Sequence, residues 1–587
     1  MKEDRKSFFA YVRSKSTSNV KVASLETEKG RVINSAHEKA EALNDFLCSV
    51  FTKEKNSDIP VPDFCFDNQC MNKLADIVID PVTITEKLPS LKPDKAAGDD
   101  KLSPRYLKSI SSEIAIPIAM IFRKSLSTGC IPTDWKTANI TPLFKKGKRS
   151  EVANYRPVSL TSLVCKIVES VLRDELVNHL EKYNLIKESQ HGFRRGFSCT
   201  SNLLSFLETV TDCIDNKMHI DAVYLDLAKA FDKVPRQRLL AKLKAHGVDG
   251  LVHRWIEEWL TDRQQRVCLD GCYSKWRQVW SGVPQGSVLG PVLFLIFIND
   301  LDNGLSSNIL KFADDTKLYR PVNIVNSQSD GSQLQHDLDA VSRWADLWQM
   351  EFNVSKCKVM HYGKGNIGYK YSMNGQSVEE VDSEKDLGIT ITTDLKATAH
   401  CQEAYSKANR MLGLISRTIQ FKNPAVLTSL YKSMVRPHLE YCSSAWNPHY
   451  NKDKILLERI QHRFTRMFPH LRSLPYEARL SRLKLWSLEE RRNRADMIEI
   501  FKMVKGLSGT LWSRFFHKAE DSSTRGHSWK LTKRNCRGNT RLYFFSQSAI
   551  NRWNNLSQED IDSPSINSFK NRLERRRTRQ MDFFMDT

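Results

Sequence analysis

Two short apolar segments of this chain each end in aspartate, and this feature limits the possible fold more than any other. The segment "AVYL" (222–225) leads directly into Asp226, and "KFADDTKLY" (311–319) places Asp314 beside Asp315. Adjacent carboxylates repel each other and cost desolvation energy when they are buried. A surface turn would tolerate them, because Asp is a common turn residue. A divalent cation would instead compensate their charge.

The rest of the chain favours the cation. Asp226 and Asp314 are 88 positions apart in sequence, so strand pairing has to bring them together. Two neighbouring strands that each end in Asp would place three carboxylates in one cluster, as a two-metal site requires. Asp232, Asp300 and Asp302 are alternative ligands of the same chemical type, but they lie beyond the ends of the predicted strands.

The net charge indicates a polyanionic partner. The chain has a formal charge of +21 and a pI of about 9.3. Residues 451–587 hold 29 Lys and Arg against 15 Asp and Glu, which gives +14 of that total. Nucleic acid is the first candidate and an anionic membrane surface the second, with a merely basic surface as the alternative.

Cysteine usage and hydropathy favour an intracellular protein of the nucleus or cytoplasm that is not secreted. The 13 cysteines form no regular framework. Cys268 and Cys272 are the only close pair and lack further ligands at zinc spacing, so no zinc is expected. The longest apolar run, "VLGPVLFLIFI" (288–298), is too short to span a bilayer, and the charged N-terminus has no apolar signal segment. We therefore expect no membrane partner.

Helical and strand-like segments alternate along the chain, which predicts an α/β or α+β class. Helical spacing is present over 37–51, 162–183 and 334–350, and an Asn374-Gly375 turn indicates a hairpin. Residues 89–104 are rich in Pro, Gly and Lys and are expected to form a loop or linker. From residue 399 onward the pattern is helical.

An ordered set of motifs resembles the reverse transcriptases of non-LTR (LINE-type) retrotransposons, with the jockey and chicken-repeat-like clades most similar. Three segments resemble the core palm motifs: "YLDLAKAFDKV" (224–234), "SGVPQGSVLGPVLF" (281–294) and "KFADDTKLY" (311–319). Three earlier segments resemble finger motifs: "WKTANITPLFKKG" (135–147), "NYRPVSLTSLVCKIVE" (154–169) and "QHGFRRGFSCTSNLL" (190–204). "VDSEKDLGI" (381–389) resembles the primer-grip region, and the tail segments "LEYCSSAWNPH" (439–449) and "RLYFFSQSAINRWNNL" (541–556) also recur in that group.

The resemblance implies an α+β right-hand polymerase with a ferredoxin-like palm. It divides the chain into an N-terminal helical lead-in (1–88), fingers (89–220), a palm (221–375), a primer grip with a helical thumb (376–470), and a mainly helical, basic C-terminal region (471–587). The implied function is RNA-directed DNA synthesis on an RNA template from a DNA primer.

The resemblance also implies the catalytic residues. The family's metal ligands fall on Asp226, Asp314, Asp315 and the backbone carbonyl of Leu227. Two Mg²⁺ ions and deoxynucleoside triphosphates are the implied cofactors and substrates, since Mg²⁺ favours carboxylates together with substrate phosphates.

Further positions match residues that contact the nucleotide. Phe231 matches an aromatic steric gate against ribonucleotides, with core packing as the alternative. Gln285 and Gly286 match a turn at the incoming nucleotide, where glycine permits close approach of the backbone, as Gly282 also does. Lys356 resembles a proposed general acid for the leaving pyrophosphate.

Basic residues complete the set. Lys145, Lys146 and Arg156 match finger residues that hold the triphosphate, with solvated surface charge as the alternative. Arg575, Arg576 and Arg577 form a basic cluster that we expect to contact nucleic acid, with a solvated helical face as the alternative.

Two absences shape the remaining expectations. Elements of this group usually have an apurinic-type endonuclease upstream, and nothing of that length precedes the fingers, so the chain resembles a second half or a truncated copy that a separate endonuclease would assist. A Cys-His zinc knuckle is also missing. One alternative is a catalytically silent, retrotransposon-derived RNA-binding protein. The other is a group II intron maturase-like or telomerase-like reverse transcriptase, and the finger and tail motifs disfavour this second alternative.

Overall fold

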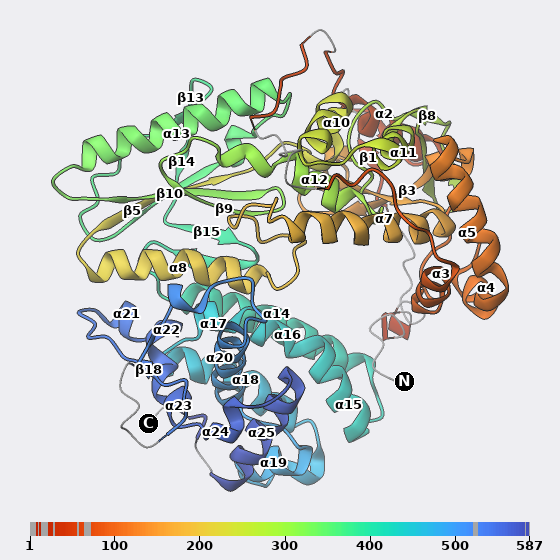
Figure 1. The fold of residues 1–587 in the computed structure, drawn as a ribbon. Coiled ribbons are helices and arrows are strands. Elements are labelled where there is room, and N and C mark those ends of the chain that lie inside the picture. Colours follow the sequence, from red (N-terminus) through yellow and green to blue (C-terminus); the bar gives the residue numbers. More distant parts are fainter. Residues whose placement is uncertain are drawn as a thin grey trace.

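Two five-stranded sheets lie side by side above a large body of helices (Figure 1). The computed structural model describes residues 8–9, 11–12, 22–26, 30–55, 58–63, 72–519, 526–580 and 583–585. The predicted N-terminal lead-in (1–88) therefore falls partly outside the described residues. The mixture of helices and separate, largely antiparallel sheets confirms the predicted α+β class.

The central sheet has the order β14-β11-β5-β10-β9. Its strands are β5 (His219–Leu225), β9 (Asn308–Phe312), β10 (Asp315–Val322), β11 (Lys358–Tyr362) and the short β14 (Glu379–Glu380). Strand β5 pairs antiparallel with both β10 and β11, and β10 pairs antiparallel with β9. Helices separate β5 from β9 and β10 from β11, so the four main strands form a ferredoxin-like arrangement.

The second sheet has the order β4-β3-β6-β7, with β8 paired to β6. Its strands are β3 (Thr137–Phe144), β4 (Tyr155–Leu160), β6 (Gln264–Leu269), β7 (Cys272–Tyr273) and β8 (Arg277–Gln278). Strands β3 and β6 pair in parallel although they are far apart in sequence. Residues 264–278, which lie in the predicted palm (221–375), therefore complete a sheet that begins in the predicted fingers (89–220).

Helices cover both faces of the central sheet. One face shares a hydrophobic core with α7 (Leu163–Lys182), α10 (Arg236–Ala245), α11 (Gly250–Leu260), α12 (Gly290–Phe297) and α13 (Ser327–Leu347), of which α13 packs directly on β10. The other face packs against α8 (Cys199–Asp215). Alternating side chains of β5 enter the two cores, Val223 one and Ala222 the other, as strand geometry requires. Helix α8, which lies within the predicted fingers (89–220), thus packs on the central sheet.

The C-terminal half continues the core beneath α8 (Figure 1). It begins with the hairpin β15 (Ser383–Asp386) and β16 (Ile389–Thr392). The helices that follow are α14 (Thr398–Thr418), α15 (Pro424–Leu430), α16 (Pro437–Glu440), α17 (Ser443–Trp446), α18 (Asn451–Thr465), α19 (Tyr476–Leu483), α20 (Leu488–Val504), α21 (Asn539–Leu542), α22 (Phe545–Ser548), α23 (Ile550–Asn554), α24 (Gln558–Ile561) and α25 (Ile566–Arg579). One hydrophobic core extends through these helices, so the predicted thumb and C-terminal region are not separate folding units.

Shorter elements complete the molecule. They include β1 (Leu25–Glu26), β2 (Val32–Ile33), α2 (Ala36–Ser49), α3 (Pro81–Lys87), α4 (Pro104–Ser109), α5 (Ser111–Thr128), α6 (Thr133–Lys136), α9 (Ala230–Lys233), β12 (Ser372–Met373), β13 (Gln376–Ser377), β17 (His517–Lys518) and β18 (Leu531–Thr532). Helix α2 confirms the predicted helix over 37–51 and packs on β6 of the second sheet. Within the described ranges, no helix combines the length and the apolar character needed to cross a membrane.

Candidate active site

Strand pairing brings the two aspartate segments together. Thr316 on β10 lies opposite Leu225 on β5, so the next pair along the antiparallel ladder is Asp315 and Asp226. Asp314 occupies the turn between β9 and β10. The sequence predicted this convergence from strand ends alone.

The turn before the two aspartates has an unusual backbone. Ala313 has φ = 58°, in the left-handed region that non-glycine residues rarely adopt. The side-chain oxygen of Gln190 accepts a hydrogen bond from Ala313 N at 2.9 Å and another from Gly192 N at 2.7 Å. A residue in such a conformation persists only where its surroundings fix it, so Gln190 helps to define where Asp314 lies.

The three carboxylates influence one another electrostatically. Burial raises the pKa of Asp314, and the charge of Asp226 raises it further. The pKa of Asp315 is raised to about 6, first by burial and then by Asp314, with smaller contributions from Asp386 and Asp226. The Asp315 side chain is still open to solvent on one side. The folded protein therefore disfavours the fully charged cluster.

The backbone carbonyl of Leu227, next to Asp226, takes no part in the local strand pairing. Leu227 lies opposite Phe352 in an isolated antiparallel bridge. The hydrogen bonds of that bridge run from Asn353 N to Asp226 O and from Ala228 N to Glu351 O, each 2.8 Å. The carbonyl oxygen of Leu227 is not used by this bridge, which is compatible with its predicted role as a ligand.

The donor set fits a divalent cation. Carboxylate and carbonyl oxygens are hard ligands of the kind that Mg²⁺ prefers, and a cation would remove the repulsion that raises the pKa values of Asp314 and Asp315. Among the described residues, no three Asp, Glu, His or Cys side chains already converge tightly enough to hold a metal ion. Asp226 Oδ2 instead lies 3.3 Å from Lys356 Nζ, in a half-exposed ion pair.

A basic hairpin lies within electrostatic range of the carboxylates. Lys145 and Lys146 follow β3 and Arg156 lies on β4, and all three side chains are exposed. Lys145 N donates to Asn154 O at 2.8 Å, which closes the hairpin. Burial and the charge of Arg156 lower the pKa of Lys145, whereas Asp226 raises it.

Phe231 is half-buried and stacks on Phe294 of α12, with ring centroids 4.5 Å apart and an interplanar angle of 17°. Packing of that kind was the alternative to a steric gate, and it accounts for one face of the ring. The carbonyl oxygen of Phe231 accepts a hydrogen bond from Val283 N at 2.8 Å. Gly282 has φ = 89°, and a Cβ there would meet the carbonyl oxygens of Phe231 and Asp232 at 2.6 Å. The close approach of these two motifs therefore requires glycine.

Gln285 links strand β4 of the second sheet to helix α9. Its carbonyl oxygen accepts a hydrogen bond from Ser159 N of β4 at 2.8 Å. Its side-chain amide donates to the carboxylate of Asp232, with Nε2 3.3 and 3.4 Å from the two oxygens. Gly286 has φ = 116°, and a Cβ there would lie 2.7 Å from Ser159 O.

Asp232 is the residue whose position the sequence did not foresee. The sequence presented it only as an alternative metal ligand, whereas in the structure it is half-buried and accepts a hydrogen bond from Gln285. Burial raises the pKa of Asp232 to about 6. Its only signal in the sequence is that it lies six positions after Asp226, in the same motif.

The other alternative ligands have different partners. Asp300 pairs with the buried Lys242 at 2.6 Å and accepts a hydrogen bond from Trp344. Asp302 pairs with Lys311 at 3.1 Å. Both carboxylates compensate buried lysines, so their charge is already balanced inside the protein.

The C-terminal arginines have unequal surroundings. Arg576 pairs with Asp560 at 2.7 Å. Arg577 pairs with Glu490 at 2.6 Å and lies over the ring of Trp486. These two ion pairs fix α25 to its neighbours, whereas Arg575 is exposed.

Carboxylates at the end of a central sheet, with lysine and arginine on a neighbouring hairpin, define the class of metal-assisted phosphoryl-transfer enzymes. Residues 144–413 match the family model described as reverse transcriptase (RNA-dependent DNA polymerase). This span is therefore a reverse transcriptase domain, of the kind found in jockey-like non-LTR mobile elements. The resemblance inferred from the motifs is confirmed.

Relatives in insects support the assignment. The chain is 29% identical over 388 residues to the RNA-directed DNA polymerase from mobile element jockey of Drosophila melanogaster, which covers 63% of this chain and 42% of the relative. It is 27% identical over 413 residues to the probable RNA-directed DNA polymerase from transposon BS of the same species, covering 65% and 44%. A Pol polyprotein from retrotransposable element R2 of Popillia japonica is 26% identical over 246 residues, covering 39% and 33%. The chain spans less than half the length of these relatives.

Proposed function

We propose that this chain is an RNA-directed DNA polymerase of a non-LTR retrotransposon, which adds deoxynucleotides to a primer 3′-hydroxyl on an RNA template. The observation that supports this most strongly is the register of β5 and β10, in which Thr316, directly after Asp315, pairs with Leu225, directly before Asp226. The fold suits this chemistry, because phosphoryl transfer depends mainly on alignment and charge neutralisation.

In this proposal, two Mg²⁺ ions would be held by Asp226, Asp314, Asp315 and the carbonyl of Leu227. Bound there, the ions would lower the pKa of the primer hydroxyl and neutralise the departing pyrophosphate. The chain's own contribution is to keep these oxygen ligands on rigid strand ends, so that little reorganisation is needed when the nucleotide arrives.

Residues around the carboxylates receive the nucleotide. Lys145, Lys146 and Arg156 clamp the triphosphate oxygens, since lysine and arginine bond strongly to phosphate. With a cation held by Asp226, Lys356 would no longer be needed as its partner and would be available to donate a proton to the leaving group. Its ion pair with Asp226 marks it as close enough to take part.

Selection of the nucleotide falls to Phe231 and the Gln285-Gly286 turn. The edge of Phe231 that is not packed on Phe294 excludes a ribose 2′-hydroxyl. Asp232 orients the amide of Gln285 toward the base, and Gly286 lets the backbone come close to it.

The architectural names follow from these roles. The central sheet with α8 and α10–α13 is the palm, the second sheet with its basic hairpin belongs to the fingers, the β15–β16 hairpin is the primer grip, and α14–α18 form the thumb. The basic C-terminal helices hold template RNA, with Arg575 as a phosphate contact and with Arg576 and Arg577 mainly fixing α25. We place the protein inside the cell, because its 13 cysteines form no regular framework in the sequence.

Primer extension on poly(rA)/oligo(dT) with Mg²⁺ tests the proposal. We expect Asp314→Asn to reduce the extension rate on the order of a thousandfold and to leave RNA binding unchanged. Asp346→Asn, at an exposed position on α13, is the matched control and should retain full activity. Extension at the wild-type rate by Asp314→Asn would rule out the proposed site, and RNA binding without extension by the wild type would indicate a silent RNA-binding protein.

A further inference from the structure

A cavity of about 130 Å³ is lined mostly by residues outside the matched reverse transcriptase span (144–413). Its walls include residues from both tail motifs that the sequence singled out: 444–449 from the first and 543–548 from the second. The remaining wall is formed by α8, β16, the loop that precedes α14, Asp453 of α18 and Asp496 of α20. The fold therefore brings together two tail segments that are about a hundred positions apart, and the polymerase chemistry uses neither of them.

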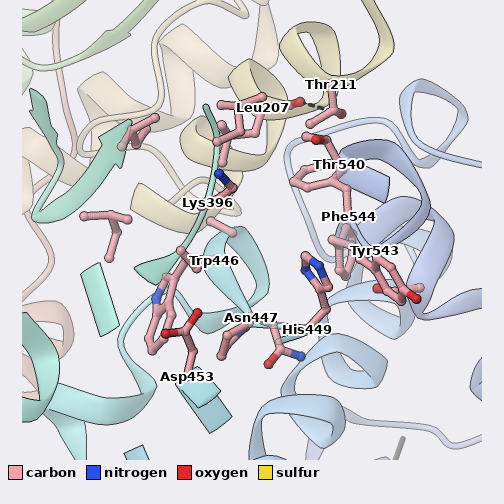
Figure 2. Close-up of a pocket in the computed structure, with 18 of the residues that line it drawn as sticks. Leu207, Thr211, Lys396, Trp446, Asn447, His449, Asp453, Thr540, Tyr543 and Phe544 are labelled. Atoms are coloured by element: carbon pink, nitrogen blue, oxygen red, sulfur yellow. Dashed lines mark hydrogen bonds between the residues drawn. The ribbon is translucent and has the colours of Figure 1, made fainter. Parts of the chain in front are cut away.

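The walls are aromatic. His449 stacks face to face on Tyr543, with ring centroids 4.3 Å apart and an interplanar angle of 1°, and it also contacts Tyr450 at 3.8 Å. Tyr543 is 44% exposed and Tyr450 is 38% exposed, so these rings reach the solvent. Figure 2 shows Trp446 on the opposite side of the cavity from His449 and Tyr543. A planar group entering from solvent would meet aromatic faces.

The buried part of the wall is rich in hydrogen-bond acceptors. Asp453 and Asp496 are each 2% exposed. Asp453 Oδ2 accepts a hydrogen bond from Thr398 at 2.8 Å, and Asp496 Oδ2 accepts one from Asn447 at 3.3 Å. Asp496 Oδ1 makes no complete hydrogen bond to a described residue, although the Ser444 hydroxyl and the charge of Arg552 both favour the charged carboxylate. An unpaired buried acceptor costs free energy that a ligand carrying donors would recover.

His449 is a second group without a partner. Its Nε2 atom is buried and has no hydrogen bond to any described residue. Burial lowers the pKa of His449, so the ring is neutral at physiological pH. A neutral imidazole offers one acceptor and one donor, and both suit the edge of a base better than they suit a cation.

Two lysines lie beside the cavity. Lys396 is exposed and pairs with Asp394 at 2.9 Å, which neutralises the third carboxylate of the lining. Lys452 lies over the ring of Tyr450, 5.8 Å from its centroid. The surrounding region, 451–587, has a net charge of +14 (29 basic against 15 acidic residues). This field attracts a polyanion and repels a basic peptide.

We propose that this cavity binds one unstacked guanine base of single-stranded RNA. The volume is well below that of a drug-sized pocket and suits a single small planar group. Unstacked RNA bases are recognised by stacking on aromatic rings and by hydrogen bonds to their edges. Guanine presents N1–H and N2–H side by side, which matches carboxylate acceptors. The lysines beside the cavity then contact the flanking phosphates.

This inference rests on the proposed function to the extent that RNA is the polymerase template. The inference adds that the chain recognises a guanosine in that RNA at a site separate from the catalytic carboxylates. An arginine side chain of a protein partner has similar donors, but it would have to approach a strongly basic surface.

Fluorescence anisotropy with the full chain tests the inference. The probes are labelled oligouridine strands that are all uridine, that contain one guanosine, or that contain one inosine, which lacks the 2-amino group. We expect the guanosine strand to bind about tenfold more tightly than the all-uridine strand, as for one good bidentate contact. The inosine strand should bind with intermediate affinity.

Two variants isolate the cavity. Asp496→Asn removes a carboxylate but keeps its shape, and it should fold because it replaces a buried charge with a neutral group. Tyr543→Leu acts at a partly exposed position and removes the stacking face. Both should lose the guanosine preference and keep oligouridine affinity within about twofold. Tyr106→Leu, an exposed tyrosine on α4, is the matched control and should keep the preference.

Specific results would overturn the inference. Equal affinity of the wild type for the three strands would do so, as would an unchanged guanosine preference in both folded variants. Binding of an arginine-rich peptide that both variants lose, without any guanosine preference, would assign the cavity to a protein partner. Extension of poly(rA)/oligo(dT), which contains no guanine, is measured in parallel, so that failure of the polymerase proposal is scored separately from failure of this one.

Discussion

At the scale of single residues, the carboxylate cluster is costly to the folded protein without a cation. The folded-state pKa of Asp315 is about 6, above its unfolded value. Folding therefore favours the protonated form of Asp315. The contribution of Asp315 to the free energy of unfolding is lost as pH rises through about 6. A neutral side chain at 315 would avoid that loss.

We predict that Asp315→Asn raises the melting temperature of the metal-free protein at pH 7.5 by about 1–2 °C, because solvent on one side screens part of the repulsion. The difference from wild type should shrink at pH 5, where wild-type Asp315 is largely protonated. Differential scanning fluorimetry in EDTA measures both values, with Asp346→Asn as the control. A less stable Asp315→Asn protein at pH 7.5 would show that the carboxylates do not repel one another.

The ring of Phe231 gives a second prediction at this scale. Phe231→Ala should increase ribonucleotide incorporation relative to deoxynucleotide incorporation, because the ring no longer meets the 2′-hydroxyl. Loss of the stacking on Phe294 should also cost about 2 kcal/mol of stability. Gel-based extension with each nucleotide, alongside thermal unfolding, separates the two effects. An unchanged incorporation ratio in a folded variant would assign Phe231 to core packing alone.

At the scale of elements, one buried ion pair fixes the β15–β16 hairpin to the catalytic strand. Lys317 on β10 pairs with Asp386 on β15, and both side chains are at least 90% buried. Lys317 also lies over the ring of Phe206 of α8, 4.8 Å from its centroid. Lys317 lies only two residues after Asp315 on β10. The ion pair therefore sets the distance between the β15–β16 hairpin and the carboxylates.

We predict that Lys317→Met lowers primer extension and stability together, because it leaves Asp386 buried and unpaired, typically at a cost of about 3–5 kcal/mol. Lys317→Met combined with Asp386→Leu should recover most of the stability but not the affinity for primer. Thermal unfolding and the KM for primer–template report the two properties. Full recovery of both in the double variant would show that the ion pair does not position the hairpin.

The elements also show what sequence can and cannot predict. The strands that lead into Asp226 and Asp314 were predictable, because an apolar run followed by a charge is a local pattern. The helix at α2 was predictable for the same reason. The pairing of β3 with β6 was not, because parallel strands far apart in sequence leave no local signal. The contact between Asp232 and Gln285 joins residues 53 positions apart and left no local signal either.

At the scale of the whole molecule, positive charge is concentrated on helices that share a core with the proposed thumb. Deleting 471–587 would expose that core, so truncation cannot test whether these helices bind nucleic acid. Point changes at exposed arginines are the better test. Arg575 and Arg579 are exposed and line one hollow on α25, whereas Arg576 and Arg577 are paired internally.

We predict that Arg575→Ala combined with Arg579→Ala weakens RNA binding and makes the slope of log affinity against log salt about 1.4 less steep, at about 0.7 for each lost phosphate contact. Arg577→Ala, which breaks the ion pair with Glu490, should lower stability more than it changes this slope. Titrations at several salt concentrations measure the slopes. An unchanged slope in the double variant would remove α25 from the nucleic-acid interface.

The central claim is that Asp226 and Asp314 act as one unit in DNA synthesis. Its most direct test is single-turnover extension of oligo(dT) on poly(rA) with Mg²⁺ by the wild type, by Asp226→Asn, by Asp314→Asn and by the double variant. Residues of one catalytic unit are strongly non-additive. We predict that each single variant loses on the order of a thousandfold in rate and that the double variant loses hardly more. Losses that multiply in the double variant, or single variants that extend primer at the wild-type rate, would contradict the account.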